Sequence, residues 1–246
     1  MSDAPKPDPS AGGGLPLFDG MKYSSSAMIE RRRRILHEAR RLINEVGFEG
    51  FSIRELSRRA RVAPKTLYNA FGDRDRLIGL AIREVYDDIR RNIRFKTADC
   101  TLSGLIDRAL VLNRGNLNAR NYARAVASIY FAPATAHDLW AGLQEMAVGN
   151  TSLWLHDVRA RGELQDWVEI EAVTRNMANM EYGLILDWSS GRVRDEDYLK
   201  RFAEIILLVA IAVSRGEQNR EAQILMQRLH SEDIGSLFEI PRISAA

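Results

Sequence analysis

Residues 51–71 read FSIRELSRRARVAPKTLYNAF, and this stretch decides the fold of the chain. It contains two short amphipathic segments separated by a few residues. Ser52 followed three residues later by Glu55 is the capping-box pattern, in which the serine oxygen accepts from one helix amide and the glutamate reaches back to another. Phe51 and Leu56 are spaced as a hydrophobic staple across the same helix start. The first segment is therefore predicted to be a helix that begins after Ser52.

The second segment begins at Pro64, whose ring suits the first position of a helix because that position needs no amide hydrogen. Leu67 and Phe71 lie four residues apart and predict one buried side. The polar side chains that remain are predicted to face outward: Lys65, Thr66, Tyr68 and Asn69. Lysine, hydroxyl and amide groups are those that bind phosphates and base edges of DNA. The whole stretch predicts a helix-turn-helix.

Further motifs extend this pattern in both directions along the chain. They are NEVGFEGFSI at 44–53, the A-x-V turn at 60–62, TLYNAF at 66–71 and GDRDRLI at 72–78. Taken in this order, from Ile29 to Tyr86, the motifs resemble the tetracycline-repressor (TetR) family of bacterial regulators over 58 of 246 residues. The chain departs from the family where it has Arg61 in place of a usual glycine, Ala63 in place of a serine cap, and Ala70 in place of an aromatic residue.

The resemblance implies an all-α protein with an N-terminal helix-turn-helix module of three helices and a larger C-terminal helical domain. It also implies a homodimer that binds a palindromic operator on double-stranded DNA, most simply as a repressor released by a small, mostly apolar ligand. The DNA contacts are expected from seven residues: Ser52, Arg54, Lys65, Thr66, Tyr68, Asn69 and Arg74. Lys65, Thr66 and Asn69 are placed near base edges, and Ser52, Tyr68 and Arg74 at phosphates, with Arg54 suited to either.

Composition divides the chain into four predicted segments. Residues 1–25 hold four of the seven prolines and a glycine run, which predicts a disordered tail. Residues 26–72 form the helix-turn-helix domain, 73–96 a connecting helix capped by Asp73 and running to about Phe95, and 97–246 a helical domain for ligand binding and dimerisation. Within that last domain, helix breaks are predicted at Pro133, Gly149-Asn150, Gly162, Gly191 and Gly216.

Charge is distributed unevenly along the chain. Residues 27–96 hold 18 Lys and Arg against 10 Asp and Glu, while the remainder holds 17 against 23. A basic module on an acidic body indicates a polyanionic partner for the first part, although runs such as Arg31–Arg34 can also be solvated helix faces. A single cysteine, Cys100, a polar N-terminus and no apolar run long enough to span a membrane predict a cytoplasmic protein.

The sequence gives no sign of an enzyme. None of the four histidines has a glutamate three residues before it, as a carboxylate-bridged metal site in a helical bundle requires. The motifs of zinc proteases, nucleophile elbows and phosphate-binding loops are also missing. We therefore expect no catalytic residue, no metal site and no cofactor.

Two long apolar segments are the candidates for a subunit interface. Residues 173–188 carry apolar side chains at helical spacing, and residues 198–213 are apolar nearly all round. A helix of the second kind must be covered on more than one side. The resemblance implies that the partner subunit covers it, in a four-helix dimer interface, whereas an ordinary monomer core is the alternative.

Aromatic and methionine side chains are concentrated in the C-terminal body, where they predict a cavity for a small apolar ligand. The predicted lining, with two polar side chains to orient the ligand, is Trp140, Met146, Trp154, Asn176, Met177, Met180, Glu181 and Trp188. Such stripes are also typical of a packed core.

Two other functions stay open at this point. One is a sequence-tolerant, architectural DNA-binding dimer without a ligand switch, and the other is a protein-interaction module with a vestigial helix-turn-helix. The sequence leaves open the effector, the operator and the choice between repressor and activator.

Overall fold

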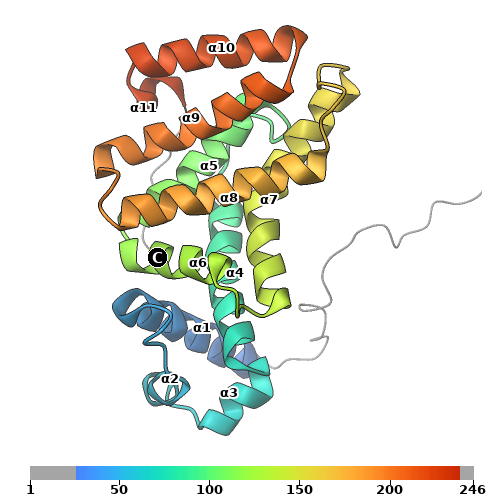
Figure 1. Ribbon diagram of the computed structural model, residues 1–246. Helices are drawn as coiled ribbons and strands as arrows, with labels where there is room; N and C mark the ends of the chain where they lie inside the picture. The colour runs from blue at the N-terminus through green and yellow to red at the C-terminus, as the bar shows by residue number, and fades with distance from the viewer. Residues whose placement is uncertain (1–25, 239–246) are drawn as a thin grey trace, which may run out of the picture.

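The computed structural model describes residues 26–238, which fold into helices joined by short loops (Figure 1). Within this range it contains no strand, only one isolated antiparallel bridge between Leu164 and Ser214. The all-α prediction is therefore confirmed, while the tail predicted for residues 1–25 lies outside the described range. The helices are α1 Ser26–Val46, α2 Ile53–Ala60, α3 Pro64–Phe71, α4 Arg74–Asn92, α5 Leu102–Leu117, α6 Arg120–Phe131, α7 His137–Ala160, α8 Ile170–Ser189, α9 Asp195–Val213, α10 Gly216–Ser231 and α11 Ile234–Leu237.

The first three helices form a small module whose buried side chains belong to one hydrophobic cluster with those of the body. α1 ends at Val46 because Gly47 takes a left-handed conformation, with φ of 72°, and its amide bonds the Ile43 carbonyl at 2.8 Å. Phe51 and Leu56 are both buried, as the staple predicts. The core of the module is completed by the apolar sides of the three helices and the start of α4: Ile35, Ala39, Leu42, Ile43, Ala60, Leu67, Phe71, Leu77 and Ile78.

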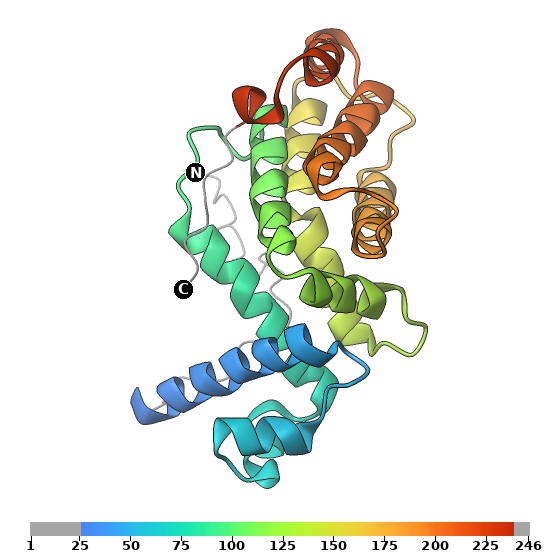
Figure 2. The same cartoon turned by 90° about the vertical axis from the view of Figure 1, so that its left-hand side faces the viewer.

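Helix α4 connects this module to the body. Asp73 caps it, since its Oδ1 accepts from the Arg76 amide at 2.7 Å, and the helix ends at Asn92 rather than near Phe95 as predicted. Figure 2 shows α1 lying below the body, where it packs against both α4 and α6. The module is thus supported by two helices, and the sequence predicted only the first of these supports.

In the body, α5 to α9 pack around a continuous apolar core, and α10 lies along α9 (Figure 1). The break predicted at Gly149-Asn150 is wrong, because both residues lie inside the unbroken helix α7. The breaks at Gly162, Gly191 and Gly216 are confirmed, and each of these glycines takes a positive φ. No helix of the described range is both long enough and apolar enough to cross a membrane.

Helix α9 is covered mainly from within its own chain. Its neighbours are α5, α8 and α10, and its buried side chains face them: Tyr198, Phe202, Ala203, Ile206, Leu207, Ala210 and Val213. The sequence did not predict that α10 would pack there, so less apolar surface is left for a partner than expected. The main exception is Leu208, which stays 60% exposed.

Candidate nucleic-acid interface and ligand cavities

Helix α2 begins as the capping box predicts, but only half of that motif forms. The Glu55 amide donates to the Ser52 Oγ at 3.4 Å. The Glu55 carboxylate does not turn back to the cap; it accepts from Arg58 at 2.7 and 2.9 Å and from Arg59 at 2.7 Å. These arginines hold the pKa of Glu55 well below its usual range, at about 2. The reason is that two cations compete successfully with the neutral cap amide for one carboxylate.

Arg59 also ties α2 to α1. Its guanidinium lies 2.6 Å from the carboxylate of Glu45 near the end of α1 and 2.7 Å from Glu55 on its own helix. Arg59 is therefore shared between two acids inside the module, whereas Arg54 and Arg58 are exposed. The basic surface of α2 thus combines a structural arginine with arginines that are open to solvent.

The turn between α2 and α3 has a residue with a side chain where glycine is usual. Arg61 takes the left-handed conformation, with φ of 52° and ψ of 47°, at a cost of about 1 kcal/mol for a residue with a Cβ. The Val62 amide bonds the Ser57 carbonyl at 3.1 Å, and the buried Ser57 hydroxyl donates to the Val62 carbonyl. These two bonds hold the turn closed and so offset the strain at Arg61.

Helix α3 presents the predicted polar face. Leu67 and Phe71 are buried against the module, while Lys65, Tyr68 and Asn69 are exposed. Thr66 lies at the edge of this face and is partly buried. At the start of the helix Pro64 occupies the first turn, and Ala63 at the N-cap position makes no side-chain cap bond.

Ala63→Ser is expected to raise the free energy of unfolding by about 1 kcal/mol, because the new hydroxyl would accept from an amide of the first turn of α3. The backbone of Ala63 already has the extended conformation of an N-cap, with φ of −68° and ψ of 146°. Urea unfolding of the two proteins measures the difference. Ala70→Ser, at the exposed end of the same helix, is the control and should bring no gain. Equal stability of A63S and the parent would show that Pro64 alone suffices to start the helix.

Arg74 packs against the surface of the module and is partly buried. Its Nη2 donates to the Phe48 carbonyl at 2.6 Å, and its guanidinium lies over the Phe48 ring, 4.3 Å from the centroid. The structure uses this arginine to fasten α4 to the loop between α1 and α2, and since 33% of its side chain is exposed, the phosphate contact stays a prediction. Arg32 makes a similar link, 4.8 Å from the ring centroid of Phe71 and bonded to the Ala70 carbonyl at 3.3 Å. Both links depend on contacts between distant segments, which no local motif reveals.

The tryptophans of the predicted ligand pocket are not gathered around one cavity. Trp154 and Trp188 are fully buried. The Trp188 ring stacks on Tyr198 with centroids 4.4 Å apart and donates to Asp195 at 2.8 Å, while Trp154 lies within hydrogen-bond distance of Gln218. Both are core residues, which is the alternative that the sequence left open for the aromatic side chains of the body.

The remaining predicted pocket residues divide into two groups. Asn176 and Met180 lie on the exposed side of α8, and the Trp140 ring stacks near Tyr130 at a centroid distance of 5.9 Å. Met146, Met177 and Glu181 do line cavities of the body. The spacing of residues in the sequence shows which side chains share one face of a helix. It does not show whether that face lines a cavity or packs in the core.

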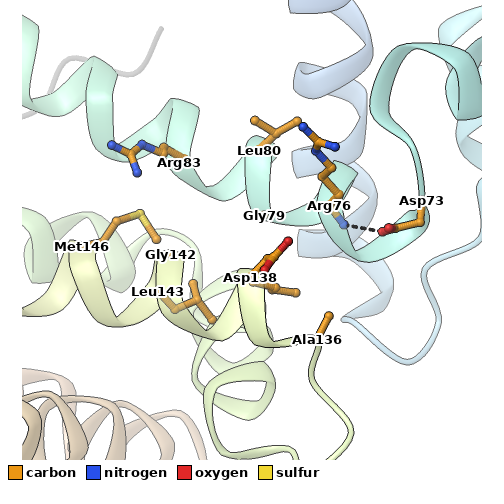
Figure 3. Close-up of a pocket in the computed structure, with 11 residues that line it drawn as sticks. Asp73, Arg76, Gly79, Leu80, Arg83, Ala136, Asp138, Gly142, Leu143 and Met146 are labelled. Atoms are coloured by element: carbon orange, nitrogen blue, oxygen red, sulfur yellow. Dashed lines mark hydrogen bonds between the residues drawn. The ribbon is translucent and has the colours of Figure 1, made fainter. Parts of the chain in front are cut away.

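Two cavities of similar size lie next to α4. The junction cavity has a volume of 130 Å³ and lies between α4 and α7, lined by Arg76, Leu80, Leu143 and their neighbours (Figure 3). The body cavity has a volume of 120 Å³, is open to solvent, and is lined by residues of α4, α5, α6, α7 and α8. A smaller void of 30 Å³ adjoins it and shares Glu181 with it. Ligand-sized space is therefore found at the connection to the DNA-binding module and just above it.

The module and its exposed α3 define the class of the protein: a helix-turn-helix protein with a helical C-terminal body. Residues 35–80 match the profile of bacterial regulatory proteins of the tetR family. This match covers most of the helix-turn-helix module and the start of α4, and over these residues the chain is similar to the TetR family of bacterial regulatory proteins.

Similar proteins show the same class. The HTH-type transcriptional regulator HbdR of Aromatoleum sp. (strain CIB) is 33% identical over 64 residues, which are 26% of this chain and only 28% of HbdR. A structure of a TetR-family transcriptional regulator from Rhodococcus sp. has a TM-score of 0.57 at 20% identity, covering 73% of this chain and 98% of that one. The structure of RolR with its ligand resorcinol has a TM-score of 0.57 at 19% identity, covering 81% of this chain and 94% of RolR. These two structures share its fold.

Proposed function

We propose that the protein is a transcriptional regulator that binds a two-fold symmetric DNA operator as a homodimer and is released by a small ligand, which makes it a repressor. The observation that carries the proposal is the exposed polar face of α3. Lys65, Tyr68 and Asn69 project from a short helix whose other side is anchored in the module core by Leu67 and Phe71. A helix held in this way is suited to enter the major groove.

The contacts on DNA follow from the chemistry of the exposed side chains. Asn69 has the amide that pairs with adenine, and Lys65 has a point charge for guanine or a phosphate. Arg54 and Ser52 at the start of α2 are exposed on the same module and suit phosphates. Arg58 also becomes a candidate, because its side chain is exposed and pairs with Glu55 on the same helix.

A homodimer is supported by the surface left open on α8 and α9. Leu208 is 60% exposed on α9 and Met180 is 38% exposed on α8, and these helices lie side by side (Figure 1). A two-fold operator needs two modules about 34–36 Å apart, which one chain cannot provide. The proposed interface is therefore formed by 173–188 and 198–213 with their counterparts, over the part of α9 that α10 leaves uncovered.

Ligand control is supported by the position of the body cavity. Its lining includes Tyr86 of α4 and Tyr122 of α6, and both of these helices pack against α1 of the module. A ligand that binds better when α4 and α6 are displaced would therefore shift the orientation of α3, and an equal affinity for both arrangements would shift nothing. A cavity of 120 Å³ admits a ligand of roughly the size of benzene. The solved neighbour RolR binds a ligand of this kind, resorcinol.

Lys65→Ala and Asn69→Ala test the assignment of α3. Lys65→Ala is expected to weaken binding to all sequences and to lower the salt slope of the DNA association constant by about one ion. Asn69→Ala is expected to reduce discrimination against wrong bases by about 1–3 kcal/mol. Both side chains are exposed, so the fold should be unchanged. Selection of the operator from a random DNA pool, followed by titrations at several salt concentrations, measures both effects.

Arg220→Ala on α10, outside the module and the proposed interface, is the control for loss of an exposed positive charge, and its DNA affinity should equal that of the parent. If the double variant of Lys65 and Asn69 binds DNA as the parent does, α3 is not the recognition helix. If the parent itself selects no sequence from the pool, the protein is an architectural DNA-binding dimer instead of a regulator of particular operators.

A further inference from the structure

The body cavity contains one carboxylate and no basic side chain among its lining residues. The carboxylate belongs to Glu181 on α8, and the polar groups beside it are the amides of Asn113 and Asn116 on α5. Burial raises the pKa of Glu181 to about 7, against a smaller opposing effect of a hydrogen bond from Asn113. Among the described residues that line the cavity, none supplies a positive charge to compensate this carboxylate.

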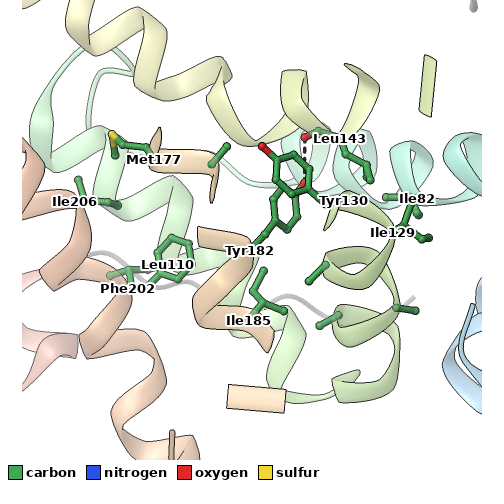
Figure 4. Packing of buried hydrophobic residues seen from close by; sticks show 14 of the residues in the cluster. Ile82, Leu110, Ile129, Tyr130, Leu143, Met177, Tyr182, Ile185, Phe202 and Ile206 are labelled. Carbon is green, nitrogen blue, oxygen red and sulfur yellow. Dashed lines mark hydrogen bonds between the residues drawn. The ribbon is translucent and has the colours of Figure 1, made fainter. Parts of the chain in front are cut away.

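Three tyrosine rings line the same cavity: Tyr86 from α4, Tyr122 from α6 and Tyr182 from α8. The ring of Tyr182 is fixed by its hydroxyl, which donates to the Leu143 carbonyl at 3.0 Å, and by stacking on Tyr130 with centroids 4.2 Å apart (Figure 4). Aromatic faces attract cations through their quadrupole, most strongly where water is excluded. Rings and carboxylate therefore favour the same sign of charge in a ligand.

Tyr122 contributes its ring to this lining. Its hydroxyl is buried away from the cavity and has no hydrogen-bond partner among the described residues.

We propose that the body cavity binds a small organic ammonium ion, with Glu181 as its counter-ion and the rings of Tyr86, Tyr122 and Tyr182 as its walls. The inference rests on the proposed function, since it names the chemical class of the regulatory ligand. A cavity of 120 Å³ limits the cationic part to about five or six non-hydrogen atoms. A neutral phenol of resorcinol type would also find hydrogen-bond acceptors here, but it would leave the charge of Glu181 uncompensated.

Calorimetric titration of the full chain, without DNA, tests the charge preference. Tetramethylammonium is the probe, tert-butyl alcohol is a neutral molecule of matched size, and phenol represents the neutral aromatic class. At pH 8 tetramethylammonium is expected to bind at least about tenfold more tightly than tert-butyl alcohol, as the combined attraction of a carboxylate and aromatic rings implies. Glu181→Gln should remove this preference, whereas Glu171→Gln, an exposed position on the same helix, should keep it.

The dependence on pH reports on Glu181 itself, because the charge of tetramethylammonium does not titrate. Among the described residues, the titratable groups around Glu181 are Tyr86 of α4, Tyr122 and Tyr130 of α6, Tyr182 of α8 and Tyr198 of α9. The described lining residues of α5 and α7 are uncharged. Burial raises the pKa of Tyr122, Tyr182 and Tyr198, so their hydroxyls stay neutral between pH 6 and pH 8. Affinity should therefore rise roughly tenfold from pH 6 to pH 8 as the carboxylate forms.

Equal or tighter binding of tert-butyl alcohol or phenol in the parent would overturn the proposal, as would undiminished tetramethylammonium binding by a folded E181Q. Thermal melts confirm that each variant is folded. Because the titration uses no DNA, a loss of the ammonium preference in a chain that still binds its operator removes this inference and leaves the proposed function intact. If the chain binds no operator but keeps the ammonium preference, the proposed function is contradicted and the ligand preference of the cavity stands.

Discussion

Leu208→Glu is expected to lower the affinity for operator DNA by at least about a hundredfold while the subunit remains folded. Leu208 is 60% exposed in the single chain, so a glutamate there stays in water when the chain is monomeric. Across a two-fold interface the substitution occurs in both subunits and buries two like charges in an apolar surface. The dimer is then lost, and each half-site must be bound by a separate chain, without the gain of linked binding.

Sedimentation at micromolar concentration and DNA titration measure the two parts of this effect. Leu153→Glu is the matched control, because Leu153 is an exposed leucine on α7. It should remain dimeric and bind DNA as the parent does. A parent that sediments as a monomer, or an L208E variant that remains dimeric with full affinity, would contradict the proposed interface on α8 and α9.

Glu181→Gln is expected to stabilise the protein more at pH 8 than near pH 5. The gain in the free energy of unfolding should be larger at pH 8 by about 2–3 kcal/mol. The pKa of Glu181 is about 7 in the folded chain, against 4.5 for an ordinary glutamate. The folded state therefore binds more protons between these values, and the stability of the parent falls as pH rises from about 4.5 through 7. Each unit of pKa difference corresponds to about 1.4 kcal/mol. Glutamine keeps the size and the hydrogen bonds of the side chain and has no such dependence.

Urea unfolding of parent and variant at pH 5, 6, 7 and 8 measures the difference, which isolates Glu181 from all other titrating groups. Glu171→Gln, exposed on the same helix, should show a difference that does not change with pH. A constant difference for Glu181→Gln as well would mean that water reaches the carboxylate and solvates its charge. Tetramethylammonium should restore much of the stability that the parent loses at pH 8, because ligand binding to the folded state alone stabilises it.

The helix-turn-helix could be predicted because its determinants are local. Phe51, Leu56, Leu67 and Phe71 are close in sequence, and each lies buried where its spacing placed it. The inward turn of Arg74 could not be predicted in the same way, because it depends on Phe48, which is 26 residues away. Local patterns fix which side of a helix is apolar, whereas a side chain with several possible partners is placed only by the assembled structure.

The same limit explains the outcome for the candidate ligand site. Trp154 and Trp188 were grouped with Met146, Met177 and Glu181 because all lie on long helices of the body. In the structure the rings of Trp154 and Trp188 are packed in the core, whereas Met146 and Met177 line cavities. Whether a side chain is packed or lines a cavity depends on how α5, α7 and α8 pack against one another. Glu181 was singled out as a group to orient a ligand, and among the two polar residues of that set it is the one that lines a cavity.

The junction cavity has a consequence for how the module can move against the body. Beside it, α4 and α7 approach so closely that a Cβ on Gly79 would lie 2.8 Å from Leu139 Cδ1, whereas Gly142 has open space around it. The cavity of 130 Å³ lies between the same two helices (Figure 3). A tilt of α4 would therefore pivot about the close contact at Gly79 and close or widen the cavity, and the DNA-binding helices would turn with it.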